Sequence, residues 1–191
     1  MPGGVVQQCD QSEPHLNNYF TKQSNFFAPL NAGCTIFVNN QPGGRFDAAD
    51  MLHQVVKHSV TSMCCAPTVW RLLVQEDLAK HKSGLALRSI CSAGEPLNPE
   101  IGRQLLAAWG LTIREGYGQT ETTCVMGNPP GHAIVEGSFG VPMPGFTMTV
   151  DGHKNEQGDI EGELCISLQG RRPVGLMVGK NKWILDNYVP P

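Results

Sequence analysis

Residues Arg114 to Thr123 read REGYGQTETT, and the rest of the chain is organised around this stretch. It places an aromatic ring between two glycines and follows it with an amide, a hydroxyl and a carboxylate. Because glycine has no Cβ, Gly116 and Gly118 would let the backbone take positive φ and approach a ligand, while Tyr117 offers a flat face for an adenine ring. We therefore interpret the stretch as the end of a short strand that continues into a nucleotide-binding loop.

The polar residues after the tyrosine carry the chemistry of a phosphate site. Gln119 and Thr120 can donate hydrogen bonds to phosphate or carboxylate oxygens. Glu121 can hold a divalent cation, Mg²⁺, that neutralises phosphate charge. The alternative is a surface turn whose tyrosine packs locally, because short glycine-rich turns are common. On the residues alone, both interpretations stay open.

A second glycine-containing segment, SAGEPL at residues 92–97, precedes this stretch. Together with GYGQTET it resembles the paired adenine-binding and phosphate-binding segments of the adenylate-forming (AMP-binding) superfamily. The runs APTVWRLLVQEDL at 66–78 and RPVGL at 172–176 resemble the medium-chain acyl-CoA synthetases in particular. The resemblance covers roughly Phe26 to Gly179 and identifies the chain as similar to an internal fragment of the large N-terminal domain of these enzymes.

The resemblance implies roles for residues of both segments. Tyr117 is expected to stack on adenine, and Glu95 with the backbone of Gly94 to Pro96 is expected to line the other side of the base. Thr120 would reach the α-phosphate and the substrate carboxylate, and Glu121 would hold Mg²⁺, so these two are the expected catalytic residues. The expected nucleotide-binding set is Gly94, Glu95, Pro96, Glu115, Gly116, Tyr117, Gly118, Gln119 and Thr120.

Two further positions are candidates for an acyl pocket. Gly140 opens the segment Gly140-Val141-Pro142, which resembles the glycine-proline segment that helps wall the pocket in this superfamily. A structural turn is an equal alternative for these three residues. Trp70 is a second candidate wall, although a tryptophan on a helix is more often a core residue. Both alternatives stay open here.

The implied chemistry consists of two half-reactions. A carboxylate attacks the α-phosphorus of ATP to give an acyl-adenylate and pyrophosphate, and the thiol of CoA then displaces AMP. The superfamily also uses a Ser/Thr/Gly-rich phosphate loop, a ribose-binding aspartate and a catalytic lysine in a C-terminal domain, and none of these is found in residues 1–60 or 180–191. We expect an ATP-dependent acyl-CoA synthetase for a medium-chain or related carboxylic acid, nearly inactive as this chain alone. The alternative is a non-catalytic adenine-nucleotide-binding or interaction module.

Short apolar runs alternate with amphipathic helical patterns up to Thr123. The expected strands are Cys34 to Val38, Val60 to Ala66, Ser89 to Ser92 and Leu111 to Arg114, of which the first two have the apolar pattern of buried strands. Helices are expected after Asp47, from Pro67 and from Pro99, the last with Asn98 as its cap and Gly110 as its stop. The expected buried stripes are Val69, Leu72 and Leu73 on the second helix, and Ile101, Leu105, Leu106 and Trp109 on the third. The pattern predicts an α/β fold with a mainly parallel sheet and flanking helices.

The strand–helix alternation also predicts where a ligand would bind. Both glycine-containing segments follow strands, and open α/β sheets bind their ligands at the carboxyl ends of the strands. The sequence therefore places the two segments at the same edge of the sheet without reference to any family.

Four segments are expected along the chain. They are a loose leader over residues 1–25, an αβ lobe over 26–140, the beginning of a small antiparallel β-barrel over 141–179, and an unrelated tail over 180–191. Phe146 to Val150 and Gly162 to Ser167 have strand patterns and are joined by a polar turn, which predicts antiparallel strands, and the resemblance implies that they begin a small β-barrel.

Composition restricts the partners. The chain of 191 residues is 40% hydrophobic and 16% charged, which is ordinary for a globular protein, and its net charge of -3 gives no basic surface for nucleic acid. No run approaches the ~20 apolar residues of a membrane span. The seven cysteines lack C-x-x-C spacing and indicate reduced core thiols. The expected partners are a small carboxylic acid, ATP and CoA, and the expected location is intracellular, in the mitochondrial matrix by resemblance or in the cytoplasm.

Overall fold

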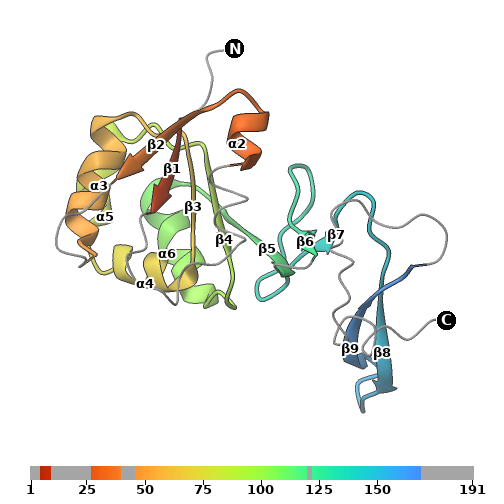
Figure 1. The fold of residues 1–191 in the computed structure, drawn as a ribbon. Helices are drawn as coiled ribbons and strands as arrows, with labels where there is room; N and C mark the ends of the chain where they lie inside the picture. The colour runs from red at the N-terminus through yellow and green to blue at the C-terminus, as the bar shows by residue number, and fades with distance from the viewer. Residues whose placement is uncertain (1–4, 10–26, 40–45, 120–121, 169–191) are drawn as a thin grey trace.

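The computed structural model describes residues 5–9, 27–39, 46–119 and 122–168. Its main sheet has seven strands in the order β2-β1-β3-β4-β5-β6-β7 (Figure 1). The parallel strands are β1 (Val5–Cys9), β2 (Thr35–Asn39), β3 (Ser62–Cys65), β4 (Ser89–Ala93) and β5 (Ile113–Gln119). Strands β6 (Thr123–Gly127) and β7 (Val141–Pro142) continue the sheet in antiparallel pairing. The predicted α/β fold with a mainly parallel sheet is confirmed.

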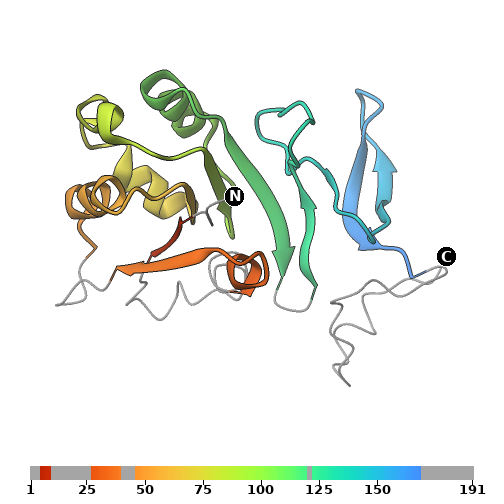
Figure 2. The same ribbon diagram turned by 90° about the horizontal axis from the view of Figure 1, so that it is seen from above.

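Most of the helices lie together on one face of this sheet (Figure 2). The elements are α2 (Ala28–Asn31), α3 (Ala48–Lys57), α4 (Pro67–Leu73), α5 (Leu78–His81), a 3₁₀ turn (Lys82–Gly84) and α6 (Pro99–Trp109). Their ends follow the predicted capping. The Asp47 and Asn98 side chains accept hydrogen bonds from the backbone N–H groups of Asp50 and Glu100, both at 3.0 Å. Gly110 ends α6 with a left-handed φ of 74°.

The core lies between these helices and the inner face of the sheet. Met63, Ile90 and Ile113 are opposite one another on β3, β4 and β5 and form its floor. Trp70 and Leu105 are fully buried above them. Two predicted core positions were wrong, because Leu72 is 39% exposed and Leu106 is 48% exposed. Leu72 precedes the buried Leu73, and Leu106 follows the buried Leu105. Successive side chains on a helix are rotated by about 100°, so the neighbour of a buried residue points away from the core.

The first two strands in the sheet order, β2 and β1, differ from the sequence predictions. Strand β1 pairs with β2 on one side and β3 on the other, so the prediction of a loose leader is wrong for Val5–Cys9. The polar pair Gln7-Gln8 interrupts the apolar pattern by which a strand is predicted. The strand forms nevertheless, because the backbone groups that pair in a sheet are the same for every residue except proline. Strand β2 is parallel as predicted, but it forms the sheet edge and Val38 is 58% exposed, which contradicts its predicted burial.

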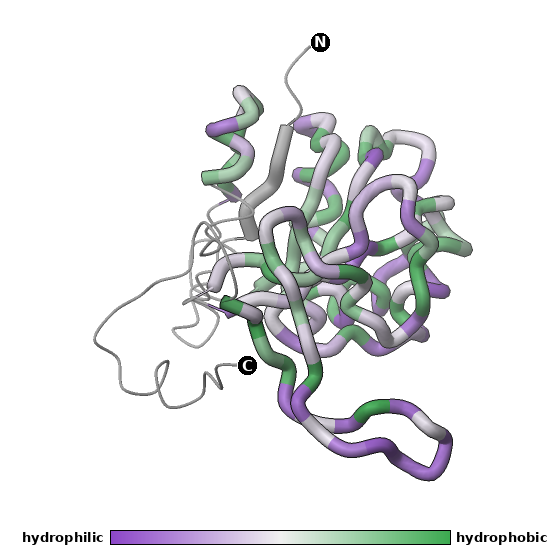
Figure 3. Tube along the Cα trace, turned by 90° about the vertical axis from the view of Figure 1, so that its right-hand side faces the viewer, coloured by the Kyte–Doolittle hydropathy of each residue, from purple (hydrophilic) through white to green (hydrophobic). Residues whose placement is uncertain are grey.

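The last described elements form a separate hairpin. Strands β8 (Met148–Lys154) and β9 (Ile160–Ile166) pair antiparallel, which confirms a small antiparallel sheet after the main one. Figure 3 shows this hairpin projecting from the main lobe, with hydrophilic residues predominating at its tip. The predicted tail over 180–191 lies outside the described residues. None of the helices in the described part of the chain is long and apolar enough to cross a membrane.

Candidate functional site

The carboxyl ends of β3, β4 and β5 meet at one edge of the sheet. Ala93 is the register partner of Gly116, so the chain leaves β4 through Gly94 directly beside Tyr117 on β5. The structure thus brings together the two segments that the sequence predicted to share an edge. Helix α4 begins at the same edge, because Pro67 follows β3 after a single residue.

The turn after β4 is held from both sides. Gly94 has φ of 98°, a backbone conformation that glycine adopts without strain. The Thr68 hydroxyl, at the start of α4, donates to the Glu95 carboxylate at 2.9 Å. On the other side, the Leu97 N–H donates to Glu115 Oε1 at 3.1 Å. The turn is therefore fixed before any ligand arrives, although Glu95 and Pro96 are themselves exposed.

Glu115 is a connecting residue of this edge. Burial raises the pKa of its carboxyl above the usual range, and the hydrogen bond from the Leu97 N–H lowers that pKa in part. Its backbone carbonyl accepts from the Asn128 side chain at 3.2 Å and from the Asn128 N–H at 3.1 Å. Glu115 thus joins the turn after β4 to the segment after β6.

The central motif differs from its predicted conformation. Residues 116–119 belong to β5 and do not form a loop, and Gly116 and Gly118 have extended backbones in place of the predicted positive φ. The pairing with β6 shifts register between Tyr117 and Gly118, and a Cβ on Gly118 would lie 1.7 Å from the Thr123 carbonyl oxygen. Glycine is therefore required at position 118 because strand β6 comes close to it, and not because a ligand does.

The end of the β5–β6 hairpin carries the polar residues of the motif. The Gln119 N–H donates to the Thr122 hydroxyl at 3.1 Å, and Thr122 is buried. This hydroxyl closes the hairpin and was not predicted to do so. Thr120 and Glu121, the predicted catalytic residues, lie outside the described residues.

Phe139 packs against Tyr117. Their ring centroids are 5.1 Å apart with an interplanar angle of 32°, so one side of the tyrosine ring is supported by protein. Asn128 positions this segment, because its buried side chain donates to the Ser138 carbonyl at 3.3 Å as well as to Glu115. Neither residue was predicted. The run GSFG at 137–140 has an aromatic residue before a glycine, as GYG does, and that likeness could have identified Phe139.

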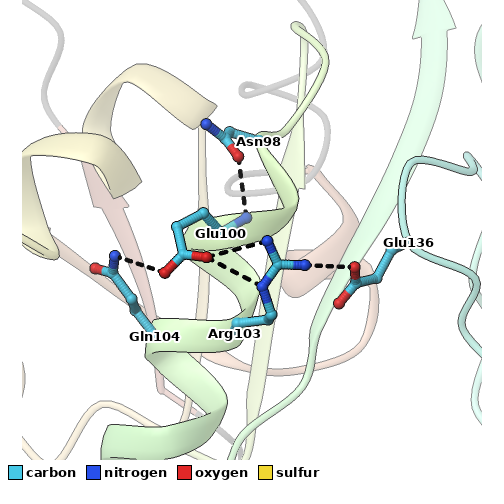
Figure 4. Close-up of polar contacts among 5 residues, drawn as sticks. All are labelled: Asn98, Glu100, Arg103, Gln104 and Glu136. Atoms are coloured by element: carbon cyan, nitrogen blue, oxygen red, sulfur yellow. Dashed lines mark hydrogen bonds and ion pairs between the residues drawn. The ribbon is translucent and has the colours of Figure 1, made fainter.

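An exposed ion-pair network joins the same segment to α6 (Figure 4). Arg103 Nη1 lies 2.8 Å from Glu136 Oε2, and Arg103 Nη2 lies 3.0 Å from Glu100 Oε2. Gln104 donates to the other oxygen of Glu100 at 3.1 Å. These hydrogen bonds, from Gln104 first and Arg103 second, hold the pKa of Glu100 below its usual range. The network therefore connects α6 to Glu136, in the segment that precedes Phe139.

The two acyl-pocket candidates have structural explanations. Trp70 is fully buried, and its Nε1–H donates to the Cys91 carbonyl at 3.0 Å. Gly140 has φ of 89°, and a Cβ there would lie 2.1 Å from the Gly127 carbonyl oxygen. These observations favour the core alternative for Trp70 and the turn alternative for Gly140.

Comparison with known proteins identifies the family of this chain. The AMP-binding enzyme family matches residues 19–171. The chain belongs to this family. It is 39% identical to the mitochondrial acyl-coenzyme A synthetase ACSM3 of Rattus norvegicus over 158 residues, which are 80% of this chain and 26% of the rat protein. It is 37% identical to 4-hydroxybutyrate–CoA ligase 1 of Metallosphaera sedula over 177 residues, which are 88% of this chain and 31% of that ligase.

The fold of this AMP-binding chain agrees with solved structures. A benzoate CoA ligase from Burkholderia xenovorans superimposes with a TM-score of 0.70 at 26% identity, covering 87% of this chain and 33% of the ligase. The chain spans about a quarter to a third of the length of the relatives it matches. The resemblance to adenylate-forming, acyl-CoA synthetase-like proteins is therefore confirmed for this part of such a protein.

Proposed function

We propose that this chain supplies the adenine and α-phosphate side of the nucleotide site of an ATP-dependent acyl-CoA synthetase. The observation that carries the proposal is the register of β4 and β5, which pairs Ala93 with Gly116 and so sets the Gly94–Pro96 turn beside Tyr117. Family membership supports it, since relatives of the chain are named as acyl-coenzyme A synthetases and CoA ligases.

Adenine would bind between Tyr117 and the Gly94–Pro96 turn. Aromatic stacking on a nucleobase contributes about 1–3 kcal/mol in nucleic-acid-binding proteins. Phe139 keeps Tyr117 from rotating away, and the hydrogen bonds to Glu95 and from Leu97 keep the turn in place. Preformed geometry lowers the ordering cost of binding, so rigidity at this edge favours affinity.

The phosphate side of the proposal rests on the end of the β5–β6 hairpin. Gln119 and Thr120 would donate to phosphate oxygens, and Thr120 would also reach the carboxylate that attacks the α-phosphorus. Glu121 would hold Mg²⁺. Mg²⁺ is usually held by one or two carboxylates together with substrate phosphates, so a single glutamate suffices. The described residues contain no group of three His, Cys, Asp or Glu that could hold a metal ion by themselves.

The second half-reaction would use CoA, whose thiol displaces AMP from the acyl-adenylate. The names of the relatives, an acyl-coenzyme A synthetase and a 4-hydroxybutyrate–CoA ligase, support a carboxylic acid as the substrate, and we propose a medium-chain fatty or related acid. The mitochondrial relatives support a location in the mitochondrial matrix.

A pyrophosphate-release assay tests the proposal. Purified chain is incubated with Mg²⁺, ATP and straight-chain carboxylic acids of increasing length, and binding of a non-hydrolysable acyl-adenylate analogue is measured in parallel. Acid-dependent pyrophosphate release that is highest for medium-chain acids would support the proposed synthetase. Analogue binding without release would support the nucleotide site and agree with the low activity expected of this chain alone, so release is the outcome that separates the synthetase from the second candidate, a nucleotide-binding module without catalysis. A folded chain that binds neither ATP nor the analogue would contradict both.

A further inference from the structure

The two faces of the parallel strands carry different chemistry. Side chains alternate along a strand, so the register row Met63, Ile90 and Ile113 faces the helices and the next row faces the opposite side. That next row consists of Cys64 on β3, Cys91 on β4 and Arg114 on β5. Two thiols and a guanidinium therefore stand side by side on the face away from the core.

A cavity of about 340 Å³ opens onto this row. Its lining includes the row itself together with Ser89 and Cys124, and Cys91 is partly exposed within it. Small solutes thus have a route to the Cys91 sulfur. The cavity lies on the other face of the sheet from the core beneath α4 and α6, and no residue of the proposed nucleotide site except Glu115 and Gly116 lines it.

Three groups stabilise a thiolate at Cys91. A hydrogen bond from the Cys64 thiol is the largest influence, and it lowers the pKa of Cys91 against the opposing effect of burial. A hydrogen bond from Ser89 and the charge of Arg114 lower that pKa further. The neighbouring Cys124 behaves in the opposite way, because burial and the charge of Cys91 raise its pKa to about 11. Its thiol donates to the Met126 carbonyl at 3.2 Å.

We propose that Cys91 is a modification site for hydroperoxides and that Cys64 is its resolving thiol. The Cys91 thiolate attacks the terminal oxygen of the hydroperoxide, the O–O bond breaks, and the sulfur is oxidised by two electrons to a sulfenic acid, while the leaving hydroxide or alkoxide takes a proton to become water or an alcohol. Cys64 then attacks the Cys91 sulfur, a disulfide forms, and the sulfenic oxygen leaves as water.

The strand geometry permits the second step. Cys64 and Cys91 are direct register partners on neighbouring parallel strands, which lie about 4.7–4.9 Å apart in any sheet. That spacing falls inside the Cα separation of about 4.4–6.8 Å that a disulfide requires. Because Cys64 already hydrogen-bonds to Cys91, the resolving sulfur needs little movement to reach its target.

Competitive alkylation of the intact chain tests the first part. Cys34 and Cys165 are matched references because both are partly exposed, on or beside strands outside the cavity. Under limiting iodoacetamide at neutral pH, peptide mass spectrometry should show Cys91 labelled about tenfold faster than either reference. Arg114→Gln should reduce that ratio, and Arg114→Lys should retain most of it. Equal labelling of the three cysteines in folded wild-type protein would overturn the proposal.

Peroxide treatment followed by non-reducing peptide mapping tests the second part. Wild type should yield one disulfide-linked peptide pair that contains Cys64 and Cys91. Cys64→Ser should lose this pair and instead accumulate a sulfenic acid at Cys91 that dimedone traps, with circular dichroism confirming the fold. A Cys91 that stays reduced, or that links to another cysteine in preference to Cys64, would overturn the assignment. Neither readout depends on nucleotide binding.

Discussion

The interior of the sheet and its carboxyl edge are built from the same three strands but held by different forces. In the interior, apolar side chains such as Met63 and Ile90 are fully buried beneath the helices. At the edge, the Gly94–Pro96 turn is exposed and is fixed by single hydrogen bonds to Glu95 and Glu115. Most of the free energy of unfolding therefore comes from the interior, and residues at the edge can be adapted to a ligand at small cost in stability.

The largest expected effect is in the interior, with Trp70→Ala. Removing a fully buried tryptophan should cost about 3–5 kcal/mol in the free energy of unfolding, and it also deprives the Cys91 carbonyl of its donor. Urea unfolding followed by circular dichroism measures the change. Leu72→Ala on the same helix is the matched control, and since Leu72 is 39% exposed it should cost less than about 1 kcal/mol. Equal costs for both variants would show that burial in the interior does not determine how much a side chain contributes to stability.

A smaller effect is expected at Glu115, where edge and interior meet. Burial raises the pKa of its carboxyl in the folded chain, so the folded state keeps this proton to higher pH than the unfolded state does. The free energy of unfolding should therefore fall as pH rises from the ordinary glutamate value, about 4.3, through the raised value. Glu115→Gln keeps an oxygen for the Leu97 N–H and should remove this component.

Unfolding in urea at a series of pH values checks the Glu115 prediction. The variant should lose stability less steeply than wild type over that window. Parallel curves for the two proteins would show that Glu115 is not desolvated as the structure indicates.

The smallest effect is expected from Glu136→Gln. The Arg103–Glu136 pair is exposed on both sides, at 54% and 58% of the side-chain surface, and such pairs contribute little because water and salt screen them. The urea midpoint should decrease slightly at low salt and match wild type at high salt. Glu156→Gln, in the β8–β9 turn, is the control. A large loss at high salt would show that this network holds more of the fold than its exposure implies.

The sequence predicted well the helices that have clear cap and stop residues, and it predicted poorly the strands whose position depends on distant parts of the chain. Helix α6 was found from Asn98, Pro99 and Gly110 because capping and termination are local properties of the chain. Strand β1 was missed because its place in the sheet depends on β2 and β3, which are distant in sequence. Local pattern cannot reveal a partner that only the folded chain supplies.

The candidate site was predicted in its location more than in its form. The pattern of strands and glycine-containing segments was enough to place both segments at one edge, and the register of Ala93 with Gly116 agrees. The conformation differed because β6 pairs with β5 and makes the motif part of a strand. Gly118 is a glycine because a Cβ there would collide with the Thr123 carbonyl oxygen on β6. Phe139 and Asn128 reach the site from a later segment, and no spacing rule within the motif could include them.

The central claim is that Tyr117 and the turn beside it form an adenine site, and isothermal titration with Mg²⁺ and ATP tests it most directly. Tyr117→Ala is compared with Phe27→Ala, an exposed aromatic next to α2 and the beginning of β2, at the other end of the parallel strands. Loss of stacking should weaken ATP binding by about 1–3 kcal/mol, or about 5- to 150-fold, while the control binds as wild type does. Equal affinities for Tyr117→Ala and wild type, or no binding by folded wild type, would contradict the account.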